Sequence, residues 1–381
     1  MKLRFIPTAL AILPAAALLQ AELAHTLPLF SRTTGEACAH CHLASSQLTP
    51  AGVAFAIDGN RSPADTVKEA RRPPVSAVAS AGASEMREVS TPPGSGTSDR
   101  DVISNRAAEL HAQLRFGDLA SVRIQANAGQ PPSLRERDVC YAQLGALGAG
   151  RSFNARVGRF DAALPLLSNR QSATIHPYLA PVDLDALGLG LQARSGRWSG
   201  GLGWIDSRQD LHADGDAPLA LRRMNDSYLW ASRGGNRGVV QASFLFDRQN
   251  STLPSLTWMQ HLKLMSGAAF SLSRLTVMPG YVFDRYDDRP SAGVHEHHQY
   301  FLLEALAPFG GHPRWLLTGR YEHDYRTRTV LTPEADRQLA VANLNCEVFS
   351  GTSVALEGSD ARDNVGGPDR RSVNARIRLV Y

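Results

Sequence analysis

Apolar and charged residues alternate strictly along several segments of the chain, and this period of two constrains the fold more than any other sequence feature. In the segment 314–325, RWLLTGRYEHDY, Trp315 and Leu317 fall on one side and Arg320 and Glu322 on the other. Side chains of a β-strand point alternately to its two faces, so the pattern predicts strands with one apolar and one charged face. Three further segments repeat the alternation: 109–116, 120–128 and 372–381.

Two all-β architectures produce such alternation, the soluble β-sandwich and the transmembrane β-barrel. The many arginines and acids on the polar faces favour the barrel, whose lumen is polar and whose lipid-facing band is apolar. The aromatic last residue, Tyr381, resembles the C-terminal signal of outer-membrane barrels. We therefore expect residues 74–381 to form an all-β, transmembrane outer-membrane β-barrel of about 16 strands, the even number being usual for this class.

The connections between the expected strands fall into two groups. Short turns on the periplasmic side and long loops on the extracellular side are the rule for these barrels, which places Tyr381 on the periplasmic side. The expected tight turns lie at 117–118, 148–151, 195–197, 234–237, 273 and 351. The expected long polar loops are 129–138, 161–186, 207–226, 247–256, 284–297, 326–337 and 359–371. The first strand is expected within 73–89, followed by a Ser-, Pro- and Gly-rich loop at 90–107.

The first 24 residues predict export of the protein. Lys2 and Arg4 precede an apolar stretch from Phe5 to Leu19, and small residues follow, which is typical of a secretory signal peptide. We therefore expect the protein in the outer membrane of a Gram-negative bacterium, in contact with outer-membrane lipid. The formal net charge of +4 is too small to indicate a nucleic-acid partner.

The sequence Cys38-Ala39-His40-Cys41-His42 is a CxxCH motif, which attaches c-type haem. Two thiols at this spacing form thioethers with the two vinyl groups of one haem, and His42 is then the proximal iron ligand. A zinc site would need a second ligand pair nearby, and a redox CxxC would need a thioredoxin-like βαβ pattern; neither follows. For the other face of the iron, His25 is the preferred candidate, with Met86 or an open position as alternatives.

The segment 25–73 is too short to wrap a haem in the manner of a soluble cytochrome c domain. We expect it to carry one covalent haem c and to plug the barrel lumen from the periplasmic side. The lumen-side arginines either line a wet lumen, which is the preferred interpretation, or neutralise haem propionates: Arg115, Arg123, Arg320, Arg376 and Arg378. Cys140 and Cys346 lie in strands distant in order, so we expect them not to pair.

Three stretches of the sequence resemble a known family, the fused outer-membrane porin–cytochromes of iron-oxidising bacteria. They are LPLFSRTTGEACAHCH at 27–42, LTPAGVAFAIDGN at 48–60 and RRPPVSAVASAGASEM at 71–86. The family joins a monohaem N-terminal segment to a sixteen-stranded barrel. The resemblance implies that Cys38 and Cys41 are the thioether residues and that His42 binds the iron. The family typically reads LTPFGRxFKLxGY, from which this chain departs at Ala51, Val53 and Asn60.

The resemblance also implies a function, the transfer of electrons from extracellular Fe(II) through the haem to a periplasmic carrier such as a soluble cytochrome. The protein would then act as an Fe(II) oxidase without acid–base chemistry, and no catalytic residue is assigned. Two other hypotheses stay open: an outward conduit to an extracellular acceptor, since direction is set by potential, and a porin with a structural plug.

Two expected extracellular loops contain possible iron ligands, because carboxylates and imidazoles suit Fe(II). An alternative interpretation of both loops is that they are ordinary solvated loops. The loop DLHADGD has a further alternative, a structural Ca²⁺ site. The second loop, DLHADGD, contains Asp210, His212, Asp214 and Asp216. The first loop, FDRYDDRPSAGVHEHH, contains Asp284, Asp287, Asp288, His295, Glu296, His297 and His298.

Overall fold

The structure is a computed structural model, and it describes the strands of the chain with parts of their connections. The described residues are 52, 75–89, 99–102, 106–116, 119–128, 139–148, 151–161, 179, 185–206, 226–235, 238–249, 259–272, 274–288, 294–309, 315–327, 335–349, 352–365 and 369–380. The expected signal peptide and haem segment, 1–24 and 25–73, lie outside these residues except for Gly52.

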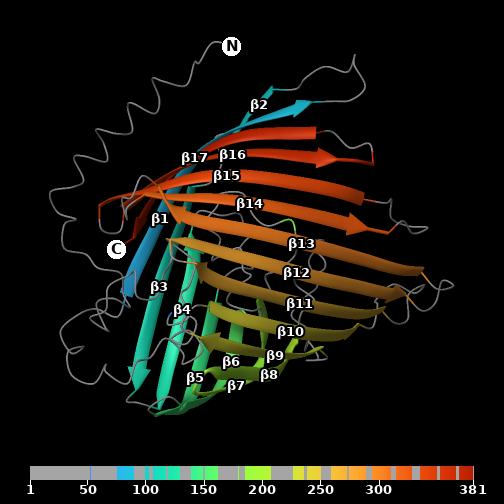
Figure 1. Cartoon of the computed structure of the whole chain (residues 1–381). Helices are drawn as coiled ribbons and strands as arrows, with labels where there is room; N and C mark the ends of the chain where they lie inside the picture. Colours follow the sequence, from blue (N-terminus) through green and yellow to red (C-terminus); the bar gives the residue numbers. More distant parts are fainter. Residues whose placement is uncertain are drawn as a thin grey trace.

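The described chain is all-β, as the alternation predicts (Figure 1). Its strands are β1 (Val75–Val89), β2 (Asp99–Val102), β3 (Arg106–Phe116), β4 (Ala120–Ala128), β5 (Val139–Gly148), β6 (Arg151–Asp161), β7 (Asp185–Ser195), β8 (Trp198–Asp206), β9 (Asp226–Gly235), β10 (Gly238–Gln249), β11 (Met259–Leu272), β12 (Leu275–Asp288), β13 (Val294–Pro308), β14 (Trp315–Arg326), β15 (Ala335–Phe349), β16 (Thr352–Asp363) and β17 (Asp369–Val380). No helix in the described part of the chain is long and apolar enough to cross a membrane.

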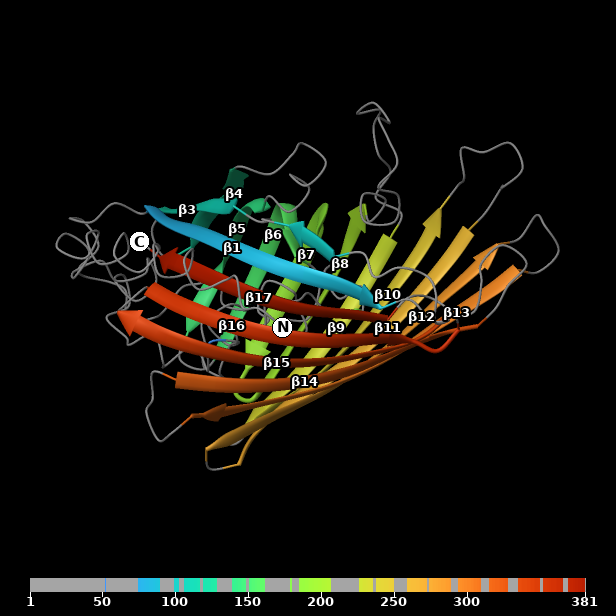
Figure 2. The ribbon, with the colours of Figure 1, turned by 90° about the horizontal axis from the view of Figure 1, so that it is seen from above.

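The strands pair into one sheet that closes on itself. Each strand from β3 to β17 pairs antiparallel with its neighbour in sequence. β1 pairs antiparallel with β3 along one edge and with β17 along the other, which joins the two ends of the series. The view in Figure 2 shows the strands running round a common interior. The short strand β2 adds a further pairing to β1. A closed sheet of this kind has no free edge, as a membrane barrel requires.

The two faces of the sheet differ in chemistry and in exposure. On β9, Tyr228 and Trp230 are buried whereas Leu229 between them is 55% exposed. On β14, Arg320 and Glu322 are buried whereas Tyr321 is 45% exposed. In a closed sheet the buried face is the interior, so the charged side of the alternation on β14 faces inward, and the exposed outward face is apolar; β9 adds aromatic side chains to the interior. This is the arrangement of a barrel in lipid.

All six tight turns predicted from the sequence are confirmed, because the strands on either side end and begin at the expected residues. Gly196, with a φ of 58°, occupies the left-handed region in the turn between β7 and β8, where a side chain would be disfavoured. The short turns all lie at one end of the sheet, and the longer connections lie at the other.

Two predicted loops are wrong in extent. The loop expected at 284–297 is confined to 289–293, because β12 continues to Asp288 and β13 begins at Val294. The loop expected at 359–371 is confined to 364–368. Both stretches are polar, which favoured loops in the sequence. Cross-strand pairing satisfies the backbone of a strand whatever its side chains are, so barrel strands extend beyond their apolar outward positions.

Candidate functional site

The interior of the sheet is lined by polar and charged side chains that have almost no exposure. Glu304, Thr318 and Asn343 are each 0% exposed, and Glu357 is 1% exposed. Side chains this deeply covered pack against neighbouring groups inside the sheet and do not face open water.

One wall of the interior, formed by β12 to β16, is rich in buried acids. It contains Asp284, Glu304, Glu322, Asp324 and Glu357. The Nζ atom of Lys263 on β11 lies 3.8 Å from Asp284 Oδ2. Asn343 donates a hydrogen bond to Glu357 at 3.1 Å. Buried carboxylates need such partners, because a charge removed from water is costly unless it is paired.

Glu322 on this acidic wall connects two distant parts of the chain. Its Oε1 atom lies 3.0 Å from Nε of Arg320, and its Oε2 atom accepts a hydrogen bond of 2.7 Å from the backbone N–H of Leu179. Leu179 belongs to the connection between β6 and β7, whereas Glu322 lies on β14. In the order of pairing, β14 stands on the opposite side of the ring from β6 and β7. Leu179 thus contacts a strand on the far side of the ring from β6 and β7.

The opposite wall, formed by β4 to β9, has aromatic rings and arginines, and one acid stands among its buried side chains that the structure describes, Asp226 on β9. Tyr141, Phe160 and Tyr228 form a chain of edge contacts, with ring centroids 6.3 Å and 6.4 Å apart. The guanidinium of Arg156 lies over the ring of Tyr141 at 5.1 Å and donates through Nε to Gln143 at 2.9 Å. Arg123 is hydrogen bonded to the Tyr141 hydroxyl. On β4 to β8, Arg156 is the one charged residue among the buried side chains that the structure describes.

This aromatic wall, defined by Tyr141, Phe160, Tyr228 and Trp230, offers no flat open surface to the haem c that the CxxCH motif implies. The rings of Tyr141, Phe160 and Tyr228 meet edge to face, all four side chains are 5% exposed or less, and the buried acid Asp226 lies on the same strand as Tyr228. Two buried polar atoms of the wall have no hydrogen-bond partner among the described residues: Gln143 Nε2 and the Tyr228 hydroxyl. The residues that would attach the haem, Cys38, Cys41 and His42, and the candidate ligand His25, lie outside the described residues.

The expected iron-binding loop is distributed over two paired strands. Asp284 pairs in register with His298, and Asp287 pairs with His295. Positions 284 and 287 are three residues apart in one strand and so belong to opposite faces of the sheet.

His297 and His298 are consecutive in β13 and so belong to opposite faces of the sheet, where they have different partners. His298 Nδ1 lies 3.0 Å from the Tyr300 hydroxyl, whereas the ring of His297 lies 5.8 Å from that of Phe283. Within the described residues, no group of three or more His, Cys, Asp or Glu side chains is placed to hold a metal ion. Asp210, His212, Asp214 and Asp216 lie outside those residues, and the side chains of Asp287, Asp288, His295 and Glu296 are not described.

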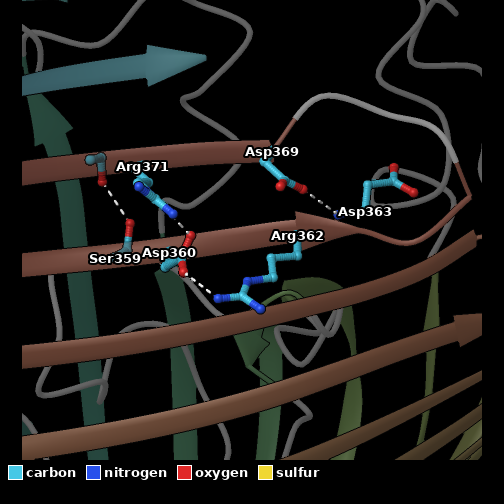
Figure 3. Close-up of polar contacts among 7 residues, drawn as sticks. Ser359, Asp360, Arg362, Asp363, Asp369 and Arg371 are labelled. Carbon is cyan, nitrogen blue, oxygen red and sulfur yellow. Dashed lines mark hydrogen bonds and ion pairs between the residues drawn. The ribbon is translucent and has the colours of Figure 1, made fainter. Parts of the chain in front are cut away.

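The long-connection end of β16 and β17 has an exposed polar network (Figure 3). Asp360 accepts hydrogen bonds from Arg362 at 3.2 Å and from Arg371 at 3.4 Å. The Asp369 carboxylate accepts the backbone N–H of Asp363 at 3.3 Å. These contacts hold the ends of the two strands together beyond the apolar outward band.

Other expected residues are placed as follows. Arg320 is inward and buried, and Arg123, Arg376 and Arg378 are half-buried. Cys140 and Cys346 form no disulfide with each other, as expected. Sequence reasoning missed Arg156, Phe160, Tyr228 and Trp230 as interior residues. In the segment 226–232, DSYLWAS, a period of two places Tyr228 and Trp230 on the face opposite Leu229. Because all three residues are apolar or aromatic, the sequence shows no contrast between the two faces, and the period could not be recognised.

The comparisons with known proteins show the fold of the chain. No family model and no curated protein sequence matches it. The anion-selective porin from Comamonas acidovorans has a TM-score of 0.56 at 10% identity, covering 81% of this chain and 98% of that one. The outer membrane channel DcaP of Acinetobacter baumannii has a TM-score of 0.56 at 11% identity, covering 81% and 97%. OmpF of Salmonella typhi has a TM-score of 0.55 at 11% identity, covering 81% and 97%.

These similarities define the class. The chain has the fold of an outer-membrane porin, and its apolar outward face supports the outer-membrane location expected from the sequence.

Proposed function

We propose that the protein is an outer-membrane electron-transfer protein that moves electrons between an extracellular donor, Fe(II) in the first instance, and a periplasmic carrier such as a soluble cytochrome. The observation that carries the proposal is the CxxCH motif of Cys38, Cys41 and His42, which precedes the porin-like strands in the sequence. The hydrocarbon part of a membrane is about 30 Å thick, too far for one useful electron step. A redox centre inside the barrel shortens that step.

The proposed architecture has a complete wall of sixteen transmembrane strands, β1 and β3 to β17, with the segment 25–73 filling the lumen. When bound, haem c supplies a one-electron centre that alternates between ferric and ferrous iron. The chain's own residues would hold that centre: Cys38 and Cys41 by thioethers, and His42 and His25 as ligands of the iron. The polar interior and the connection that Leu179 anchors to Glu322 would restrict the passage of solutes.

Fe(II) would meet the protein at the long-connection end. Carboxylates and imidazoles at the ends of β12 and β13 would serve as a transient docking surface: Asp287, Asp288, His295, His297 and His298. Asp284 is 1% exposed beside Lys263 and would not take part. The distribution of the docking residues over both faces of the sheet suits a substrate that has to leave after oxidation. The opposite direction of flow, outward to an extracellular acceptor, needs the same architecture.

The test uses the full chain, made together with a c-type maturation system and purified from outer membranes. The absorbance spectrum is recorded before and after anaerobic addition of Fe(II). We expect a c-type haem that Fe(II) reduces quickly, and a C38A/C41A variant that forms the same barrel without haem. A haem that stays oxidised would discard Fe(II) as the donor. A wild-type protein without haem would overturn the proposal.

A second candidate function is a solute-conducting porin with a structural plug, which the porin fold favours. Conductance in planar lipid bilayers separates the two. We expect the haem-loaded protein to conduct little, because its inward side chains are buried. A large, steady conductance together with absence of haem would establish the porin.

A further inference from the structure

The outward face of the sheet has two exposed arginines at the long-connection end of β16 and β17. Arg362 on β16 and Arg371 on β17, called here the arginine pair, both donate to the carboxylate of Asp360 and approach it from two sides (Figure 3). Arg371 lies directly opposite Asp360 in the register of the two strands. Arg362 and Asp360 are two residues apart on one strand and so share a face. Two positive charges and one negative charge meet in this group.

The arginine pair keeps most of its capacity to donate hydrogen bonds. The side chains of Arg362 and Arg371 are 60% and 66% exposed. A guanidinium has five N–H groups, and the contacts with Asp360 engage Nη2 of Arg362 and Nε of Arg371. Asp360 therefore restrains the two arginines without using up their donors. Neighbouring guanidiniums with free N–H groups suit a phosphate, whose oxygens accept paired hydrogen bonds.

The arginine pair begins where the apolar outward band ends. Val373 on β17 and Leu356 on β16 belong to this band and are 58% and 56% exposed. Arg371 is two residues from Val373 on the same face, which places their Cα atoms about 6.6 Å apart. Asp360 is four residues from Leu356, again on the same face. In a barrel that crosses a membrane, the edge of the apolar band is the depth of the lipid headgroups.

The surroundings leave the membrane side of the arginine pair positively charged. The residues in register with the pair on the adjoining strands are Gln338 on β15 and Arg87 on β1, neither of them an acid. Asp369 is on the outward face of β17, but it lies farther from the apolar band than the pair and accepts the backbone N–H of Asp363. On the membrane side, the outward positions described on β16 and β17 contain no carboxylate. An anionic headgroup can therefore approach the pair from the membrane without repulsion.

The long-connection end of such a barrel is extracellular, where the outer leaflet consists of lipopolysaccharide, a glycolipid with phosphates on its sugars. We propose that the arginine pair binds a phosphate of one lipopolysaccharide molecule, whose acyl chains lie along Leu356 and Val373. The contact combines charge-assisted hydrogen bonds to the phosphate with apolar contacts to the acyl chains. The site involves no haem, so it stands or falls separately from the proposed electron-transfer function.

The experiment measures lipid binding by the full chain, purified in detergent and freed of lipopolysaccharide. Bis-phosphorylated lipid A is titrated, and bound lipid is counted by native mass spectrometry. R362Q and R371Q each remove one outward charge. R337Q is the matched control, because Arg337 is 52% exposed at the same end but shares the inward face of β15 with buried Leu339. We expect R362Q and R371Q each to weaken binding at least about fivefold, the effect of one cation near an anionic lipid, and R337Q to leave it unchanged.

Two further probes separate the phosphate from the acyl chains. Lipid A without phosphates should bind weakly, and equally to the wild type and to R371Q. Inorganic phosphate at the same concentration should not displace lipid A, and displacement would overturn the lipid as the occupant.

The variants also define the result that would overturn the site. Equal affinity of the wild type, R362Q and R371Q for bis-phosphorylated lipid A, or an equal loss in R337Q, would mean that the arginine pair does not bind the phosphate. Heat-modifiable electrophoretic mobility shows whether each variant has folded, and either of the two outward variants alone is enough for the comparison.

Discussion

The two faces of β14 differ in what they contact and in what they demand of the sequence. Outward, Trp315, Leu317 and Tyr321 are 40%, 43% and 45% exposed to the surroundings of the barrel. Inward, Arg320 and Glu322 contact each other, and Glu322 also contacts Leu179. The outward face therefore needs apolar side chains but no particular shape complementarity, whereas each inward polar group needs a particular hydrogen-bond or ion-pair partner. Mutations on the two faces should fail for different reasons and by different amounts.

The largest effect is expected inside, at Glu322. E322A would leave Arg320 buried beside a lost partner and the Leu179 N–H without its acceptor, at a cost of about 3–5 kcal/mol in the free energy of unfolding. E322Q keeps an acceptor for Leu179 and should cost less. Urea unfolding in lipid vesicles, followed by tryptophan fluorescence, measures both. Equal losses in the two variants would contradict a contribution from the hydrogen bond between Leu179 and residue 322.

The next largest effect is expected outside, at Leu303. This side chain on β13 is 50% exposed and lies in the apolar outward band. L303R would place a charge in lipid and cost about 2–4 kcal/mol in the free energy of insertion and folding. Gln299, on the same face nearer the long-connection end, is the control, and Q299R should cost no more than about 1 kcal/mol. If the two arginines cost the same, β13 does not cross the membrane as described.

A smaller effect separates paired from unpaired groups within the interior. Asn343 donates to Glu357, and its removal in N343A should cost about 1–2 kcal/mol in the free energy of unfolding. Thr318 pairs in register with Asn343, is equally buried, and its hydroxyl has no hydrogen-bond partner among the described residues. T318V should be neutral or slightly stabilising. A larger loss in T318V than in N343A would mean that an undescribed partner holds the threonine.

The smallest effect is expected at the rim, where inside and outside both meet water. Arg362 is 60% exposed, and its pair with Asp360 is screened by solvent. R362A should change the free energy of unfolding by no more than about 0.5 kcal/mol, and the change should vanish at high salt. A loss that persists at high salt would show that the network in Figure 3 fixes the strand ends by packing.

Much of the fold follows from local sequence patterns. The positions of the six tight turns and the orientation of the two faces of β14 could be predicted from the sequence. Turn residues and alternating charges are recognisable within a few consecutive residues. The extents of β12 and β13 could not be read, since Asp284 and His298 belong to strands only through each other. The contact between Leu179 and Glu322 is likewise invisible in the sequence, because ring closure brings together residues far apart in the chain.

The candidate site likewise has one part that could be predicted from the sequence and one part that could not. The spacing of the CxxCH motif is enough to predict haem attachment, without knowledge of the fold. Attachment at Cys38 and Cys41 and iron ligation by His42 remain predictions. The aromatic wall has no such spacing. Phe160 is contributed by β6, and Tyr228 and Trp230 are contributed by β9. In the sequence, apolar inward residues cannot be told from lipid-facing ones, because the closed sheet determines which face is inside.

The seam between β1 and β17 has a consequence for how the protein is made. It joins Val75–Val89, among the first barrel residues to be synthesised, to Asp369–Val380, among the last. Until the last strand is available, the sheet keeps two open edges and cannot enclose anything. Whatever occupies the interior must therefore be in position before the final strand docks, or enter afterwards through an end. The barrel can therefore close only after β17 has been synthesised and has paired with β1.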